Sequence, residues 1–183
     1  MTTLATRFSQ DRRLAALGVV GFAAALAAAS QVAMPIPGTP VPITLQPLVV
    51  VLAGMMLGPA AGAASMLLYL AVGAAGVPVF APVGAPGIAR FAGPTGGYLL
   101  AYPVSAYVAG FLAQRMPSLP GRWLAATAGI ALLFVGGVAQ LTVLTGSVSR
   151  AVALGITPFA AFDVLKALAA AAIARPRARS ARD

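Results

Sequence analysis

The chain has 183 residues, of which 60% are hydrophobic and only 8% are charged, and its mean hydropathy is +0.94. A soluble domain carries about 25% charged residues, so this composition excludes both a water-soluble globular protein and a disordered one. The net charge of +9 does not indicate a nucleic-acid partner, because the few arginines lie near the chain ends and in predicted loops.

Six apolar segments follow one another along the chain and predict an all-α membrane protein with six transmembrane helices. A bilayer core about 30 Å thick needs about 20 apolar residues per helix. The first segment carries no charge and is too long for the apolar region of a signal peptide, which has about 7–15 residues. The whole chain, residues 1–183, is expected to form a single integral-membrane domain. Its predicted spans are residues 14–34, 43–57, 60–76, 97–114, 124–144 and 151–174.

Two loops rich in proline and glycine interrupt these segments. Residues 35–42 contain proline too densely for a helix, so we expect an extended loop at the membrane surface. The short second segment is either a tilted helix or half re-entrant, and Gly58-Pro59 predicts a tight turn after it. Residues 77–96 form a long loop of a kind that is uncommon unless functional. We expect this loop to cap a cavity on the extracellular side.

The arginines support an even number of spans. Positive residues gather on the cytoplasmic side of membrane proteins, and six spans would place only Arg90 and Arg150 on the opposite side. We therefore predict a multi-pass protein of the cell (inner) membrane with both termini cytoplasmic, and we interpret the basic tail as a topology anchor. The cytoplasmic set would be Arg7, Arg12, Arg13, Arg115, Arg122, Arg175, Arg177, Arg179 and Arg182.

Several classes of chemistry lack their residues in this chain. It has no His, no Cys and no Glu, which removes His- and Cys-dependent catalysis, disulfides, and the usual zinc and iron–sulfur sites. Lys166 does not follow the glycine pattern of a phosphate-binding loop. We therefore expect no enzyme, no metal and no cofactor, and the chain is too small to carry its own energy-coupling domain.

Asp163 and Lys166 stand out because they lie inside the sixth predicted span. A charge at membrane depth costs at least about 2.5–3.5 kcal/mol, and the spacing of three residues places both side chains on one helical face. The pair is either a self-neutralising structural ion pair or a polar ligand site that faces the bundle interior. We favour the ligand site, because it offers acceptors and donors to a ligand head with N–H and C=O groups.

Other candidates for a site flank the proline-rich loops. Arg90 either clamps a carboxylate or is a solvated loop charge. Thr44 and Gln46 either hydrogen-bond a ligand or satisfy freed backbone groups. The aromatic residues Tyr69, Phe80 and Tyr98 either stack on a ligand or belong to an interfacial belt.

Small residues mark surfaces where helices approach closely in lipid. Gly54, Gly58 and Gly62 are spaced by four residues, and so are small residues of the first span. These spacings indicate either packing within the chain or a docking face for a partner membrane protein. The candidate docking residues are Gly21, Ala23, Ala25, Ala27 and Ala29.

With these motifs in order, the chain resembles the BioY family, the biotin-specific substrate-binding (S) components of energy-coupling factor (ECF) transporters. The resemblance runs from about residue 14 to 174, and its motifs are specific only together. They are Val41-Pro-Ile-Thr-Leu-Gln46, Leu52-Ala-Gly-Met-Met-Leu-Gly-Pro59, Tyr69-Leu-Ala-Val-Gly-Ala-Ala-Gly-Val-Pro-Val-Phe80, Gly93-Pro-Thr-Gly-Gly-Tyr98 and Asp163-Val-Leu-Lys166.

The resemblance implies a six-helix S-component fold with a biotin pocket near the extracellular surface. It implies that Asp163 accepts the ureido N–H of biotin, that Lys166 donates to the ureido carbonyl, and that Thr95 and Tyr98 line the site. Some members carry an arginine where this chain has Leu99 and an asparagine near Ala85 or Pro86. We hypothesise that Arg90 contacts the biotin carboxylate in place of the arginine and asparagine that this chain lacks.

The resemblance also implies partners, namely a transmembrane coupling protein, docked on the first helix, and two ATPases. We therefore predict a high-affinity biotin-capture subunit of an ATP-dependent importer. A self-sufficient secondary transporter or channel, with Asp163 relaying protons, is the alternative from another class. An S component for a different vitamin is the third hypothesis.

Overall fold

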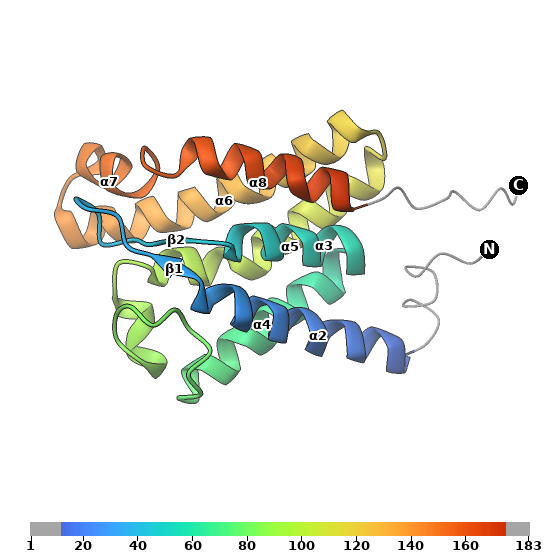
Figure 1. Cartoon of the computed structure of the whole chain (residues 1–183), viewed down its shortest axis with the longest axis horizontal. Coiled ribbons are helices and arrows are strands. Elements are labelled where there is room, and N and C mark those ends of the chain that lie inside the picture. The colour runs from blue at the N-terminus through green and yellow to red at the C-terminus, as the bar shows by residue number, and fades with distance from the viewer. Residues whose placement is uncertain (1–11, 175–183) are drawn as a thin grey trace, which may run out of the picture.

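The computed structural model describes residues 12–174, and these form a bundle of α-helices with a small β-ladder at one end (Figure 1). Arg7 and the basic tail from Arg175 onward, which the sequence predicts to be cytoplasmic, lie outside the described residues. The helices are α2 (Arg12–Gln31), α3 (Gln46–Leu57), α4 (Pro59–Ala74), α5 (Gly96–Arg115), α6 (Leu119–Thr145), α7 (Val148–Gly155) and α8 (Ala160–Ile173). Strands β1 (Ala33–Met34) and β2 (Ile43–Thr44) and the 3-10 helix η1 (Gly87–Ala92) complete the elements.

Proline, glycine and serine set the ends of these helices. Gly58 has a φ of 93°, and Pro59 then opens α4, so α3 and α4 are separated by the tight turn that Gly58-Pro59 predicts. The Ser118 hydroxyl caps α6 by accepting from the Gly121 N–H at 3.2 Å. Gly146, with a φ of 68°, ends α6 in the left-handed conformation that glycine adopts without strain.

Three of the described helices, α2, α5 and α6, are long and apolar enough to cross a membrane. The pair α7 and α8 qualifies only when taken together, and it is bent by 55° at the break between its helices. Helices α3 and α4 are apolar but shorter, with 12 and 16 residues. At 1.5 Å per residue, α3 is about 18 Å long, well short of a hydrocarbon core of about 30 Å.

The predicted span boundaries need four corrections. Residues 33–34, predicted as the end of the first span, form β1, which pairs antiparallel with β2. Residues 43–44, predicted as the start of the second span, form β2 because the proline-rich segment between the strands folds back as a hairpin. Helix α6, which contains the predicted fifth span, begins at Leu119 rather than at residue 124, because the Ser118 hydroxyl caps it there. The predicted sixth span is two helices rather than one.

Glycines allow three helices to meet in the centre of the bundle. A side chain at Gly54 of α3 would collide with the backbone of Ala106 on α5, and one at Gly62 of α4 would collide with Gly54. A side chain at Gly110 of α5 would also meet the Gly54 backbone. Gly54 and Gly62 therefore serve packing within the chain, whereas Gly58 serves the turn.

The candidate docking residues of α2 do not share one face. Ala23 and Ala29 are buried within the chain, Ala27 is half-buried, and Gly21 and Ala25 are exposed. Ala23 packs in the same cluster as Leu26, Met66 and Tyr69. Of the five residues, only the two exposed ones present their surface fully to a partner, because α2 turns its other side toward α3 and α4.

Candidate functional site

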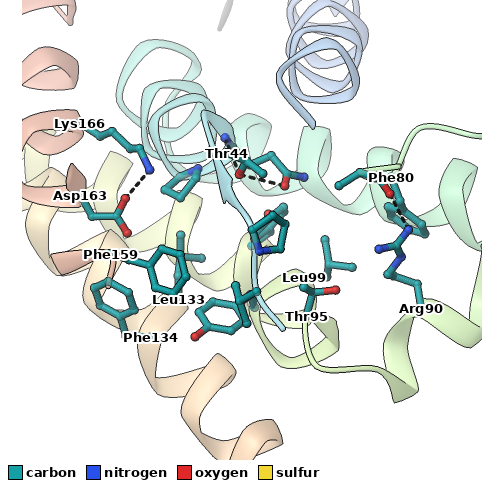
Figure 2. Close-up of a pocket in the computed structure, with 17 residues that line it drawn as sticks. Thr44, Phe80, Arg90, Thr95, Leu99, Leu133, Phe134, Phe159, Asp163 and Lys166 are labelled. Carbon is teal, nitrogen blue, oxygen red and sulfur yellow. Dashed lines mark hydrogen bonds and ion pairs between the residues drawn. The ribbon is translucent and has the colours of Figure 1, made fainter. Parts of the chain in front are cut away.

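A pocket opens at the end of the bundle where the β-ladder, the 77–86 loop and the α7–α8 break come together (Figure 2). The empty space of the pocket, its open mouth included, is about 660 Å³. Its lining comes from segments far apart in the sequence. These residues are Val41, Pro42, Thr44, Gln46, Pro47, Phe80, Ala81, Arg90, Thr95, Tyr98, Leu99, Tyr102, Leu133, Phe134, Phe159, Asp163 and Lys166.

All the residues predicted for substrate binding lie in this lining. They are Asp163, Lys166, Arg90, Tyr98, Thr95, Gln46, Thr44 and Phe80. Tyr69, the further aromatic candidate, lies behind the wall and is buried, with 1% of its surface exposed. The fold therefore gathers residues that the sequence spreads from position 44 to position 166, while their contact with a ligand stays a prediction.

One end of the pocket carries the ion pair of Asp163 and Lys166. The Lys166 Nζ donates to Asp163 Oδ1 at 2.6 Å, and the side chains are 11% and 6% exposed, respectively. Asp163 lies in the first turn of α8, where the positive end of the helix dipole favours a carboxylate. The break before α8 places this turn at the pocket rather than in the middle of a continuous span.

A chain of buried polar groups lies on the β2–α3 side of the pocket. The Thr44 hydroxyl donates to Gln46 Oε1 at 3.2 Å, and Gln46 Nε2 donates to the Tyr69 hydroxyl at 2.9 Å. The Gln46 amide is thus held in one orientation by groups on both of its atoms. The predicted alternative for Thr44, that it satisfies freed backbone, also has support, because its Oγ1 accepts from the Gln46 N–H at 3.3 Å.

Arg90 lies at the other end of the pocket and is only 5% exposed, so the predicted alternative of a solvated loop charge is wrong. Its guanidinium donates to two carbonyls of the 77–86 loop, Ala81 O at 2.6 Å and Val83 O. Its Nε is buried and has no hydrogen-bond partner among the described residues. Burial lowers the pKa of Arg90 from its ordinary value, although arginine stays protonated near neutral pH.

Aromatic rings form much of the wall between these two ends. The Phe80 ring lies edge-on to Tyr69, with 5.4 Å between centroids, and edge-on to Phe91 at 5.8 Å. Tyr98 packs against Gly137, where a side chain would collide with its ring, and its hydroxyl donates to Gly155 O at 2.7 Å. This bond joins α5 to the end of α7, next to the break that precedes Asp163.

Sequence reasoning missed the apolar part of the lining. Tyr102, Leu133 and Phe134 lie inside long apolar helices, where nothing in the sequence separates a residue that faces a pocket from one that faces lipid. Leu99 drew notice only as a departure from an expected arginine, and it is buried in the wall. The Ala85 and Pro86 positions are exposed and do not line the pocket.

The arrangement suits an elongated ligand with two different polar ends. Figure 2 shows Asp163 and Lys166 on one side of the pocket and Arg90 with Phe80 on the other, with Leu99, Leu133 and Phe159 among the apolar groups between them. The ion pair can offer one acceptor and one donor to a hydrogen-bonding head group. The guanidinium is placed to attract an anionic end, and apolar walls suit the part between.

Comparisons with known proteins identify relatives of this chain. Residues 4–183 match the model of the BioY family. The "Biotin transporter BioY" of Thermotoga maritima is 34% identical over 139 residues, which cover 76% of this chain and 82% of that protein. The "Probable biotin transporter BioY" of Pyrococcus horikoshii is 38% identical over 135 residues, covering 74% and 79%.

The fold also has a counterpart among solved structures. The crystal structure of the S-component for biotin from an ECF-type ABC transporter superposes with a TM-score of 0.82 and covers 90% of each chain, at 24% sequence identity. At that identity the likeness shows a shared fold.

Proposed function

This chain belongs to the BioY family, and on that premise we propose that it is a biotin-binding S component of an ECF-type vitamin importer. Biotin would enter the pocket from outside the cell, and the protein would deliver it inward. The role is transport, and no catalytic step is assigned to any residue.

The observation that carries the proposal is the gathering of the predicted residues around one pocket with a buried ion pair at its end. Biotin has a ureido group with N–H donors and a carbonyl acceptor at one end, and a carboxylate at the other. Asp163 would accept from the ureido N–H, and Lys166 would donate to the ureido carbonyl. Arg90 would attract the carboxylate through its Nε, the guanidinium nitrogen that the loop carbonyls leave unused.

The membrane arrangement follows from the same assignment. We propose a single membrane domain in which α2, α3, α4, α5, α6 and the bent pair α7–α8 make six passes. The short α3 and α4 would be accommodated by local thinning of the bilayer. The 77–86 loop with η1 would cap the pocket on the extracellular side, and both termini would lie in the cytoplasm of a multi-pass protein of the cell membrane.

Transport would need partners that this chain does not contain. An S component works with a transmembrane coupling protein and two ATPases, and we propose the same partners here. The exposed Gly21 and Ala25 of α2 are the part of the predicted docking set that a coupling protein could reach.

Biotin titration of the purified protein in detergent tests the proposal. We expect saturable, tight binding in calorimetry, or biotin that co-purifies, and displacement by unlabelled biotin but not by thiamine or riboflavin. Displacement by another vitamin would move the assignment to that vitamin. Proton-coupled uptake of biotin into vesicles that contain this chain and no ATPase would favour the self-sufficient transporter instead.

A further inference from the structure

The 77–86 loop is fastened from two sides, and one of the two sides is α2. From the η1 side, Arg90 binds the carbonyls of Ala81 and Val83. From the α2 side, Ser30 and Gln31 bind the carbonyls of Val79 and Phe80. Successive peptide groups of the loop are thus held by side chains, in a segment that has no regular hydrogen-bonded structure of its own.

Ser30 and Gln31 act together at the last turn of α2. Ser30 is fully buried, and its hydroxyl lies 2.5 Å from Val79 O and 2.7 Å from Ala27 O. Gln31 Nε2 lies 2.9 Å from Ser30 Oγ and 3.2 Å from Phe80 O. Since the amide of Gln31 donates to both the serine and the loop, the two residues form one connection between helix and loop.

This connection ends directly at the pocket wall, although neither Ser30 nor Gln31 lines the pocket. Phe80 and Ala81, the residues whose peptides are held, do line it. The Phe80 ring fits against Gly73, where a side chain would collide with it, and against Tyr69. The ring therefore packs in one position. The backbone next to it is held by α2 through Gln31 and by Arg90 through the Ala81 carbonyl.

We propose that Ser30 and Gln31 are positioning residues that hold the Phe80–Ala81 wall closed beside the bound ligand. This inference rests on the proposed function, because the ligand it concerns is biotin. Loss of these hydrogen bonds favours an open position of the loop over the closed one. Since the bound state needs the closed wall and entry needs the open one, dissociation becomes faster while association stays unchanged or also becomes faster.

Dissociation of radiolabelled biotin from the purified protein, chased with unlabelled biotin, tests the proposal. The variants are Gln31→Ala, Gln31→Glu and Ser30→Ala. Gln31 is exposed, so its replacement leaves the core intact, and glutamate keeps the size of glutamine but has no N–H to donate to a carbonyl. We expect both Gln31 variants to raise the dissociation rate about fivefold, the effect of one neutral hydrogen bond. The matched control is Gln114→Ala, because Gln114 is also an exposed glutamine in the last turn of a helix, α5. This variant should leave the dissociation rate unchanged.

A second measurement needs no ligand. Hydrogen exchange of the 77–86 amides should be faster in the ligand-free Gln31→Ala protein, with the exchange of α5 and α6 unchanged. Wild-type dissociation rates in both Gln31 variants overturn the proposal. A wild-type rate in Gln31→Glu together with a faster rate in Gln31→Ala also overturns it, because the size of the side chain would then matter rather than its hydrogen-bond donor. If Ser30→Ala does not fold, the Gln31 variants decide. If the wild-type protein binds no biotin, the proposed function fails, and hydrogen exchange alone decides whether α2 holds the loop.

Discussion

Asp163 and Lys166 neutralise each other, yet the pair leaves hydrogen-bonding capacity free. The ion pair uses one carboxylate oxygen and one ammonium proton, so the second oxygen and the other protons can still serve a ligand. A purely structural ion pair would add little to the stability of the fold, because two apolar residues of similar size in its place are often as stable. The lining of the pocket by both residues is the observation that favours a ligand role.

Replacing Asp163 by Asn or Lys166 by Ala should weaken biotin binding by about 10- to 100-fold, because each change removes a hydrogen bond to a charged group. Calorimetric titration of the purified variants measures this. The exchanged pair, Asp163→Lys with Lys166→Asp, is the control, since it keeps the charges balanced and should insert but not bind. Wild-type affinity in the exchanged protein would show that the pair is only structural.

Arg90 holds the 77–86 loop and lines the pocket, so a single affinity cannot separate its contact with the loop from the carboxylate contact that we propose. Biotinamide, which has a neutral end, separates them. Wild-type protein should bind biotin about tenfold more tightly than biotinamide, and Arg90→Gln should weaken biotin binding and remove most of this preference, since the charge is lost. Equal weakening for both ligands in competition assays would assign Arg90 to the loop alone, and unchanged biotin affinity would exclude both roles.

At the scale of elements, the site depends on places where helices stop. The 55° break between α7 and α8 places Asp163 in a first turn beside the pocket, and the Tyr98 hydroxyl holds the end of α7 through Gly155 O. The hairpin of β1 and β2 leads into α3, and Thr44 and Gln46 line the pocket at this junction. Close contacts at Gly54 and Gly97 allow α5 to approach α3 and α6 tightly enough to complete the wall.

Gly54→Ala should lower the melting temperature by about 5 °C, because a methyl group at this position meets the Ala106 backbone and overpacking costs about 1–3 kcal/mol. Thermal unfolding in detergent measures the change. The matched control is Gly21→Ala, since nothing lies within 4 Å of a side-chain carbon at that helical position. Its melting temperature should be unchanged or slightly higher, and an equal loss in both variants would argue against the close α3–α5 contact.

At the scale of the whole molecule, the described arginines sort to two ends. Figure 1 shows the start of α2 and the end of α8 at one end, and α7 with the β-ladder at the other. Arg12 and Arg13 belong to the first of these ends, and Arg150 belongs to the second because it lies in α7. The pocket opens at the second end, so a cytoplasmic position of the arginine-rich end directs the pocket outward.

Cysteine labelling tests this orientation, because the chain contains no cysteine and a single introduced one has no background. Ser149 is an exposed residue of α7, and Pro117 is an exposed residue between α5 and α6. A membrane-impermeant maleimide should label Ser149→Cys in intact cells and Pro117→Cys only after permeabilisation. The reverse pattern would place the pocket on the cytoplasmic side and contradict uptake from outside.

Much of this protein follows from its sequence alone, because the strongest signals are local. The apolar segments, the Gly58-Pro59 turn and the Asp163–Lys166 spacing depend on residues near one another, and the motifs sufficed to indicate the family. The polar candidates for the site were also evident, since polar side chains are rare in so apolar a chain and each one stands out.

Tertiary structure alone decided how these parts meet. Arg90 is equally consistent with a solvated or a buried charge until the 77–86 loop is seen to wrap it. Pro158 marks a possible break in the predicted sixth span, but only the fold shows that this break places Asp163 at the pocket. Hydropathy cannot distinguish Leu133, which faces the pocket, from Val135, which is 65% exposed. The physical reason is that lipid, core and pocket wall all favour apolar side chains, so only the packing of distant segments determines which of the three a residue faces.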